Sequence, residues 1–330
     1  MAADPVLSVT DLSCGFRNES GYVRVVDSVS FDVEAGATLA IVGESGCGKT
    51  VSALAVMGLL PKPAGIVEAG TILFKGKNLA DAKTGELLRG MRGRHLGMIF
   101  QEPMTALNPV HRIGRQLAEA IAQHQPGLGK AELRQRAIRL LEQVGIPAAE
   151  QRFSDYPHQL SGGMRQRAII AMALAGEPEV LIADEPTTAL DVTVQAQILE
   201  LLRSLLESRG MAMIFITHDL GVVAELCDTV LVMYAGRVAE HARVRDLFVS
   251  PRHPYTRGLI DSIPKLDTVP KSPLPVIEGV VPTFESMPSG CRFSNRCRYA
   301  TDVCRSTAPP LEPCGDAHAV ACHHWRTVGP

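Results

Sequence analysis

The chain has 330 residues, with 33 Lys and Arg against 35 Asp and Glu, and a formal net charge of −2. Hydrophobic residues make up 46% and charged residues 21%, a balance that excludes wholesale disorder and collagen-like repeats. The near-neutral charge and an aromatic content of 5% give no reason to expect nucleic acid as a partner.

No stretch of the sequence is expected to cross a membrane. The most apolar run, residues 53–60, is far shorter than the roughly 20 residues that a membrane-spanning helix needs. The N-terminus carries neither the basic nor the apolar segment of a secretion signal. We therefore expect the protein in the cytosol, with a partner supplying any part that crosses a membrane.

Short β-rich runs alternate with helical patterns over the first two-thirds of the chain. Strands are predicted at residues 7–9, 23–26, 29–33, 38–42, 96–100, 180–183 and 213–216. Helices are predicted at residues 51–60, over most of residues 103–164, and along the apolar stripe of residues 198–206. A hairpin is predicted at residues 229–240. Strand, helix and strand in that order indicate a mostly parallel sheet, so the predicted fold class is α/β.

The composition changes near residue 250, where prolines begin to exclude long helices. We place a domain boundary there. Residues 1–250 are predicted to form one domain, with a helical subdomain at about residues 102–165. Residues 251–330 are predicted to form a small Pro- and Cys-rich C-terminal module.

Residues 43–50, GESGCGKT, fit the phosphate-binding pattern G-x-x-x-x-G-K-[ST] between a predicted strand and a predicted helix. The glycines let successive backbone N–H groups point at phosphate oxygens, and the start of the helix adds partial positive charge. Lys49 is expected to reach the β- and γ-phosphates, and the Thr50 hydroxyl to bind Mg²⁺. The residues expected to bind nucleotide here are Gly43, Ser45, Gly46, Cys47, Gly48, Lys49, Thr50 and Val51.

Paired carboxylates end the apolar run at residues 180–183. Asp184 at the end of such a strand can hold Mg²⁺ beside the phosphate loop. Glu185 faces differently and is predicted to polarise a water for attack on the γ-phosphate. A third motif, Ser161-Gly162-Gly163, forms a capped and glycine-rich helix start that suits a second phosphate contact.

Residues 160–167, LSGGMRQR, resemble the signature motif of the ATP-binding cassette (ABC) ATPases. Over about residues 5–250 the other motifs stand in the order of that family. The resemblance implies a P-loop NTPase of the ABC nucleotide-binding type, an ATPase. It also implies that Asp184 and Glu185 are the Walker B aspartate and the catalytic glutamate.

Further site residues follow from the same resemblance. Gln101 matches the Q-loop glutamine, a catalytic and magnesium-binding position, and His218 matches the catalytic switch histidine. Residues 189–191 match the D-loop. Phe16 is the better match for the aromatic residue that stacks on adenine, and Tyr22 is the alternative.

Other segments resemble the dipeptide/oligopeptide importer branch, notably residues 101–109, 156–159, 252–256 and 290–304. This branch implies import of dipeptides or oligopeptides across the cytoplasmic membrane, with the chain peripheral on its cytoplasmic face. The implied partners are a second ABC ATPase subunit, two transmembrane permease subunits and an extracytoplasmic peptide-binding protein. Import of nickel or another small solute, a soluble ATPase acting on nucleic acid or ribosomes, and a metal-binding regulator with a vestigial nucleotide site remain alternatives.

Five of the eight cysteines lie in the last forty residues. In a reducing cytosol such a group indicates metal binding rather than disulfides. Its spacing suits an iron–sulfur cluster or Zn²⁺, for which His318, His323 and His324 are further candidate ligands. The family resemblance implies a [4Fe–4S] cluster held by Cys291, Cys297, Cys304 and Cys322. Cys314 matches none of these ligand positions.

Overall fold

The computed structural model describes residues 4–19, 21–79, 85–101, 106–188, 190–264, 275–283 and 286–327. The chain divides into two compact units. Unit 1 comprises Met1–Val6, Val33–Ala37 and Asp81–Phe215, and unit 2 comprises Leu7–Asp32, Thr38–Ala80 and Ile216–Pro330. The chain passes from unit 1 to unit 2 for the last time within strand β8 (Ala212–Thr217).

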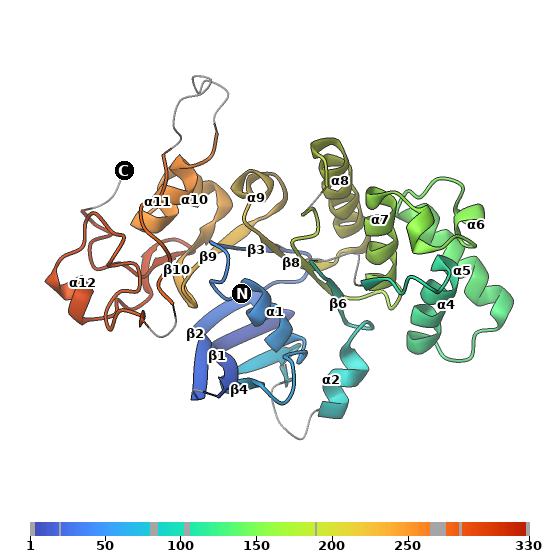
Figure 1. Ribbon diagram of the computed structural model, residues 1–330, viewed down its shortest axis with the longest axis horizontal. Coiled ribbons are helices and arrows are strands. Elements are labelled where there is room, and N and C mark those ends of the chain that lie inside the picture. The colour runs from blue at the N-terminus through green and yellow to red at the C-terminus, as the bar shows by residue number, and fades with distance from the viewer. Residues whose placement is uncertain are drawn as a thin grey trace. The chain divides into compact units, whose positions relative to one another are not determined.

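Unit 2 begins with an antiparallel sheet of four strands in the order β2-β1-β4-β5 (Figure 1). Its strands are β1 (Leu7–Asn18), β2 (Gly21–Val33), β4 (Gly65–Phe74) and β5 (Lys77–Asn78). The strands predicted at residues 23–26 and 29–33 are one strand, β2, interrupted by Ser28 with a φ of 53°. β4 was not predicted from the sequence; it pairs with β1 over most of its length.

The second sheet of unit 2 holds the core. β3 (Thr38–Val42) is buried along its whole length and runs parallel to β9 (Thr229–Tyr234). β10 (Arg237–Arg243) completes the predicted hairpin with β9. Two strands from the C-terminal module continue the same sheet: β12 (His318–Val320) pairs with β10, and β11 (Glu312–Gly315) pairs with β12. The module therefore shares a sheet with the strand that precedes the phosphate-binding motif.

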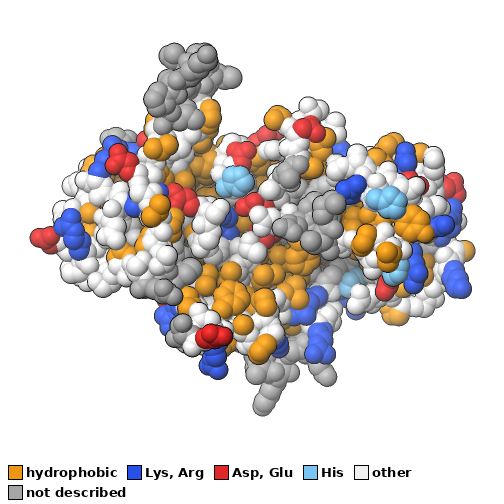
Figure 2. Space-filling model, in the orientation of Figure 1, with side chains coloured by type: hydrophobic (Ala, Val, Ile, Leu, Met, Phe, Trp, Pro, Cys, Tyr) orange, Lys and Arg blue, Asp and Glu red, His pale blue; other side chains and the backbone are white. Residues whose placement is uncertain are grey.

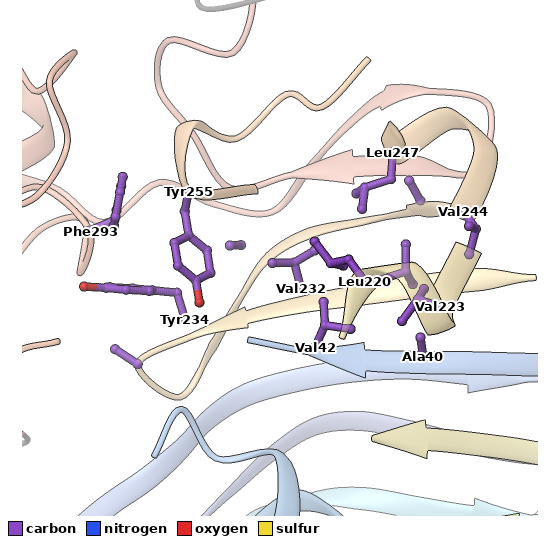
Figure 3. Packing of buried hydrophobic residues seen from close by; sticks show 14 residues of the cluster. Ala40, Val42, Leu220, Val223, Val232, Tyr234, Val244, Leu247, Tyr255 and Phe293 are labelled. Atoms are coloured by element: carbon purple, nitrogen blue, oxygen red, sulfur yellow. The ribbon is translucent and has the colours of Figure 1, made fainter. Parts of the chain in front are cut away.

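Short helices complete unit 2: α1 (Lys49–Val56), α9 (Leu220–Leu226), α10 (Val244–Val249), α11 (Pro254–Asp261) and α12 (Asp302–Ser306). One apolar cluster joins β3, β9, β10 and α9 to the module, with Tyr234, Tyr255 and Phe293 side by side in it (Figure 3). The Tyr234 ring lies 4.7 Å from that of Tyr255 and 5.1 Å from that of Phe293, centroid to centroid.

Unit 1 contains the strands β6 (Leu96–Ile99) and β7 (Val180–Asp184), which pair in parallel, next to the first residues of β8. Its helices are α2 (Gly85–Met91), α4 (Ile113–His124), α5 (Lys130–Gln143), α6 (Ala149–Arg152), α7 (Gly162–Ala173) and α8 (Val192–Arg209), with a 3-10 turn at Pro157–Gln159. Helices α4 to α7 gather into one group (Figure 1).

Side chains of both charge signs occur across the face in Figure 2, in keeping with the small net charge. Within the described ranges, every helix is too short or too polar to cross a membrane.

Candidate functional site

The phosphate-binding motif forms a loop between β3 and α1 in unit 2, as predicted. Gly43 leaves β3 with a φ of 152°, and a Cβ at this position would lie 2.2 Å from the Met233 carbonyl oxygen. Gly48 caps α1 in the left-handed conformation. Only glycine fits these two positions without strain, because one lacks space and both need a positive φ.

The Lys49 side chain folds back over its own loop. Its Nζ donates hydrogen bonds to the carbonyl oxygens of Gly43 at 2.8 Å and Glu44 at 3.3 Å. The ammonium group thus lies on the loop with only 6% of the residue exposed. An anion bound by the loop amides would lie next to the positive charge of Lys49.

Cys47 contributes backbone hydrogen bonds to the loop, and its thiol is not reactive. Its N–H donates to the Glu44 carbonyl at 3.3 Å, and its carbonyl accepts the Gly236 N–H at 2.9 Å. Burial raises the pKa of its thiol, which is 1% exposed. A protonated, buried thiol is chemically inert.

Residues of the C-terminal module contact this loop, a contact that no sequence pattern predicts. The Tyr255 hydroxyl accepts the Glu44 N–H at 2.8 Å. The Arg296 guanidinium binds both oxygens of the Glu44 carboxylate, at 2.6 and 3.1 Å. No motif joins these residues in sequence, so only the fold could reveal their contacts.

In unit 1, the structure brings Gln101 and Glu185 together. Gln101 Nε2 donates to Glu185 Oε2 at 3.1 Å, and the Thr188 hydroxyl donates to the same oxygen at 2.9 Å. Thr188 was not among the predicted site residues. Asp184, at the end of β7, is 1% exposed, whereas Glu185 has a φ of 45° and turns away from the strand. A left-handed non-glycine residue at such a place is typical of functional sites.

The signature motif starts helix α7 of unit 1. Ser161 is its N-cap and accepts the Met164 N–H at 3.3 Å. A Cβ on Gly163 would lie 2.7 Å from Val194 Cγ1 on α8, so the glycine lets the two helices approach closely. Of the predicted D-loop, Ala189 lies outside the described residues, and Asp191 caps α8. The Ser161 and Gly162 residues are exposed and available to a facing surface.

His218 and the two aromatic candidates lie in unit 2. His218 is exposed directly after β8 and before the Asp219 cap of α9. Phe16 is half-buried on β1. Tyr22 lies on β2, where burial and the negative charge of Glu68 raise its pKa to about 12. The phosphate loop, His218 and Phe16 therefore belong to unit 2, while Gln101, Asp184, Glu185 and the signature residues belong to unit 1.

Four cysteines line one small cavity in unit 2: Cys291, Cys297, Cys304 and Cys322. His323 and His324 also line it, whereas His318 pairs with Glu240 at 2.7 Å and Cys314 lies on β11. Burial, followed by the charges of the other three thiols, raises the pKa of Cys322 to about 11. Among the described residues, no three His, Cys, Asp or Glu side chains are placed to hold a metal ion. The structure thus groups the four predicted cluster ligands without forming a metal site.

The loop and the paired carboxylates define an α/β protein of the P-loop NTPase class. Residues 26–188 match the family described as "ABC transporter", and residues 239–304 match "Oligopeptide/dipeptide transporter, C-terminal region". A probable peptide ABC transporter ATP-binding protein of Sinorhizobium fredii is 51% identical over 98% of this chain and 96% of its own length. The dipeptide transport ATP-binding protein DppD of Bacillus subtilis is 49% identical over 97% and 94%. The oligopeptide transport ATP-binding protein OppD of the same organism is 47% identical over 96% and 87%.

Solved structures also show similarity to ABC transporter proteins. The cbiO1 protein of Clostridium perfringens, part of an ABC transporter complex, has a TM-score of 0.62 and 29% identity over 75% of this chain and 92% of its own. A dimeric bacterial ABC transporter cassette has a TM-score of 0.63 and 25% identity over 72% and 99%. The chain belongs to the ATP-hydrolysing subunits of ABC transporters, in the branch that carries the oligopeptide/dipeptide transporter C-terminal region.

Proposed function

We propose that this chain hydrolyses ATP to power the import of dipeptides or oligopeptides across the cytoplasmic membrane. Similarity over nearly the whole chain to peptide transport ATP-binding proteins carries this proposal. The match of residues 239–304 to the oligopeptide/dipeptide transporter C-terminal region supports peptides over nickel or another small solute. In this function the chain sits peripherally on the cytoplasmic face, with a second ATPase subunit, two permease subunits and an extracytoplasmic peptide-binding protein as partners.

The residues supply the parts of phosphoryl transfer to water. The loop amides and Lys49 bind the β- and γ-phosphates, while Thr50, Asp184 and Gln101 hold Mg²⁺. Ser161, Gly162 and Gly163 of one ATPase subunit contact the nucleotide on the loop of its partner. His218 contacts the γ-phosphate, and Phe16 stacks on adenine.

Glu185 is the general base in this proposal. Gln101 and Thr188 hold one of its carboxylate oxygens, at 3.1 and 2.9 Å, which fixes the orientation of the carboxylate. Positioned bases of this kind contribute roughly 10²–10⁴-fold in rate.

A Glu185→Gln variant of the chain, assembled with its partners in liposomes, tests the proposal. We expect ATP binding to remain, while peptide uptake and ATP hydrolysis at this site fall by at least 100-fold, the lower bound for a lost general base. Glu207→Gln, an exposed residue on α8 of the same unit, is the matched control and should behave as wild type. Hydrolysis stimulated by ribosomes or DNA and not by peptide, or uptake of nickel in place of peptide, would refute peptide import.

We further propose that Cys291, Cys297, Cys304 and Cys322 hold a [4Fe–4S] cluster. The donor set fits, because all four thiols line one cavity. When bound, the cluster would tie together a segment with little core of its own, because it replaces buried apolar surface with metal–thiolate bonds.

A further inference from the structure

The segment from Cys291 to Cys297 carries two largely buried arginines that do not line the cysteine cavity. Arg292 follows Cys291 directly and Arg296 precedes Cys297, with 15% and 5% of their side chains exposed. Neither residue belongs to a motif of the nucleotide site. Burying an arginine costs free energy unless every N–H group donates to an acceptor. The hydrogen-bond partners of these two arginines therefore indicate their role.

All five N–H groups of Arg296 are used. Two bind the Glu44 carboxylate, at 2.6 and 3.1 Å. The other three donate to the carbonyl oxygens of Ile277 at 3.1 Å and Glu278 at 2.9 Å, and to the Tyr234 hydroxyl at 3.4 Å. This bidentate, fully saturated geometry fixes the position of the Glu44 side chain far better than an exposed ion pair would.

The backbone of Glu44 is held from the same side. The fully buried Tyr255 accepts its N–H, and the rings of Tyr234 and Phe293 pack against Tyr255 at 4.7 and 5.5 Å. Figure 3 shows these three rings together at one end of the core cluster. Glu44, the second residue of the phosphate loop, is thus held at both backbone and side chain by residues beyond 250.

A second connection reaches the middle of the loop. Arg292 donates to the Ala235 carbonyl and to the Asp27 carboxylate. The next residue in that turn, Gly236, donates its N–H to the Cys47 carbonyl at 2.9 Å. The cysteine-bearing segment therefore supports the loop at two points.

The ion pair between Arg296 and Glu44 bears on ligand binding because Glu44 carries a negative charge. A carboxylate in a phosphate-binding loop repels a triphosphate, and the repulsion is strong where water is excluded. Arg296 places an opposite charge on that carboxylate. The contact thereby combines alignment of the loop with neutralisation of an unfavourable charge.

We propose that Arg296 is a positioning residue for the phosphate loop, through which the cysteine-bearing segment sets the affinity of the chain for nucleotide. The inference rests on the proposed function, since it takes this loop as the ATP site. The role is one of positioning, because all five N–H groups of Arg296 are already taken by protein acceptors.

The test measures the dissociation constant for ATP and the kinetic constants of the full-length chain assembled with its partners. For Arg296→Met we expect ATP affinity to fall about tenfold, equivalent to 1.4 kcal/mol. KM should rise while kcat changes little, because uniform binding is lost and the transition state is not specifically affected. Arg298→Met, an exposed neighbour packed on Tyr299, is the control and should match wild type.

A second change separates positioning from a general loss of packing. Glu44→Gln in the Arg296→Met background removes the bare carboxylate and should recover a large part of the lost affinity. Arg296→Lys keeps the charge but loses the planar fork, and should fall between wild type and Arg296→Met; it also serves if Arg296→Met does not fold. Wild-type affinity in Arg296→Lys and Arg296→Met, or no recovery in the double variant, would overturn the inference.

Lys49→Ala distinguishes this inference from the proposed function. If Lys49→Ala binds ATP normally, the loop is not the ATP site and both fail. If Lys49→Ala abolishes binding while Arg296→Met binds normally, only the role of Arg296 is wrong.

Discussion

The backbone conformation and the hydrogen bonds of Glu185 depend on the fold and not on its sequence motif alone. Its place after a buried strand predicts a catalytic carboxylate, but the sequence does not reveal its φ of 45° or its hydrogen bond from Thr188. The phosphate-loop residues were predicted from one contiguous motif with a strand before it and a helix after it. Tyr255 and Arg296 could not be predicted, because their contacts with Glu44 span more than 200 residues of sequence.

Two glycines of the phosphate loop should differ sharply when they are replaced by alanine. At Gly43 a Cβ would lie 2.2 Å from a backbone oxygen, whereas at Gly46, with a φ of 78°, it meets nothing within 4 Å. We expect Gly43→Ala to lower the free energy of unfolding by about 3 kcal/mol or more, from overlap and strain together.

Gly46→Ala is the internal comparison, and should cost about 1–2 kcal/mol from its left-handed backbone alone. Urea denaturation of both variants, without nucleotide, measures the difference. Equal destabilisation of the two variants would mean that the loop moves away from Met233.

At the scale of elements, local patterns predicted the buried strands well. β3, β6, β7, β8 and β9 all lie where short apolar runs placed them. β4 and β12 were missed because their residues gain strand structure from partners distant in sequence, β1 and β10, and β11 pairs in turn with β12. The prolines correctly predicted that helices beyond residue 250 are short, since α11 has 8 residues and α12 has 5.

The start of α11 should make the stability of unit 2 depend on pH. His253 is the N-cap, fully buried, and its Nδ1 accepts the Tyr255 N–H at 3.0 Å. Burial lowers its pKa to about 4, against the opposing pull of the Glu240 carboxylate. The folded state therefore keeps His253 neutral, while the unfolded state binds a proton below pH 6.5. Stability from this group is present above pH 6.5 and falls by about 1.5 kcal/mol between pH 6.5 and 5.

His253→Asn keeps a side-chain acceptor for the helix cap and removes the titrating group. Urea midpoints of both proteins across this pH range provide the measurement, and the difference between their slopes isolates His253 from every shared group. Parallel pH profiles would show that His253 is protonated in the folded protein.

For the molecule as a whole, the cysteine-bearing segment and the phosphate loop belong to one compact unit. The sequence predicts a boundary near residue 250 from composition, but composition carries no information about which surfaces pack together. Phe293 and Tyr255 lie in the same apolar cluster as Ala40 and Val42, which lead into the phosphate loop. We therefore expect a change at the cysteines to reach the phosphate loop through these packed side chains.

Cys297→Ser should affect iron and nucleotide together. We expect it to lower the iron and sulfide content and visible absorbance of the protein, because it removes one of four proposed ligands. Since Arg296 is the preceding residue, ATP affinity should also fall, by about the tenfold expected for Arg296→Met.

Cys314→Ser, on β11 and outside the cavity, should retain both iron and affinity. If Cys297→Ser lost iron but kept its ATP affinity, the cysteines would not influence nucleotide binding at the phosphate loop. An iron-free wild-type protein, purified without oxygen, would refute the cluster.

The Glu240 carboxylate on β10 has no exposed surface and accepts hydrogen bonds from His318 and from the backbone N–H groups of Arg252 and His253. Every one of these donors comes after residue 250. A chain ended at that point would lose all three hydrogen bonds and the strand β12, so that the edge of β10 would be open to neighbouring molecules. The C-terminal module is consequently part of the fold of the ATPase. We expect a chain shortened to remove it to aggregate and not to form a working enzyme.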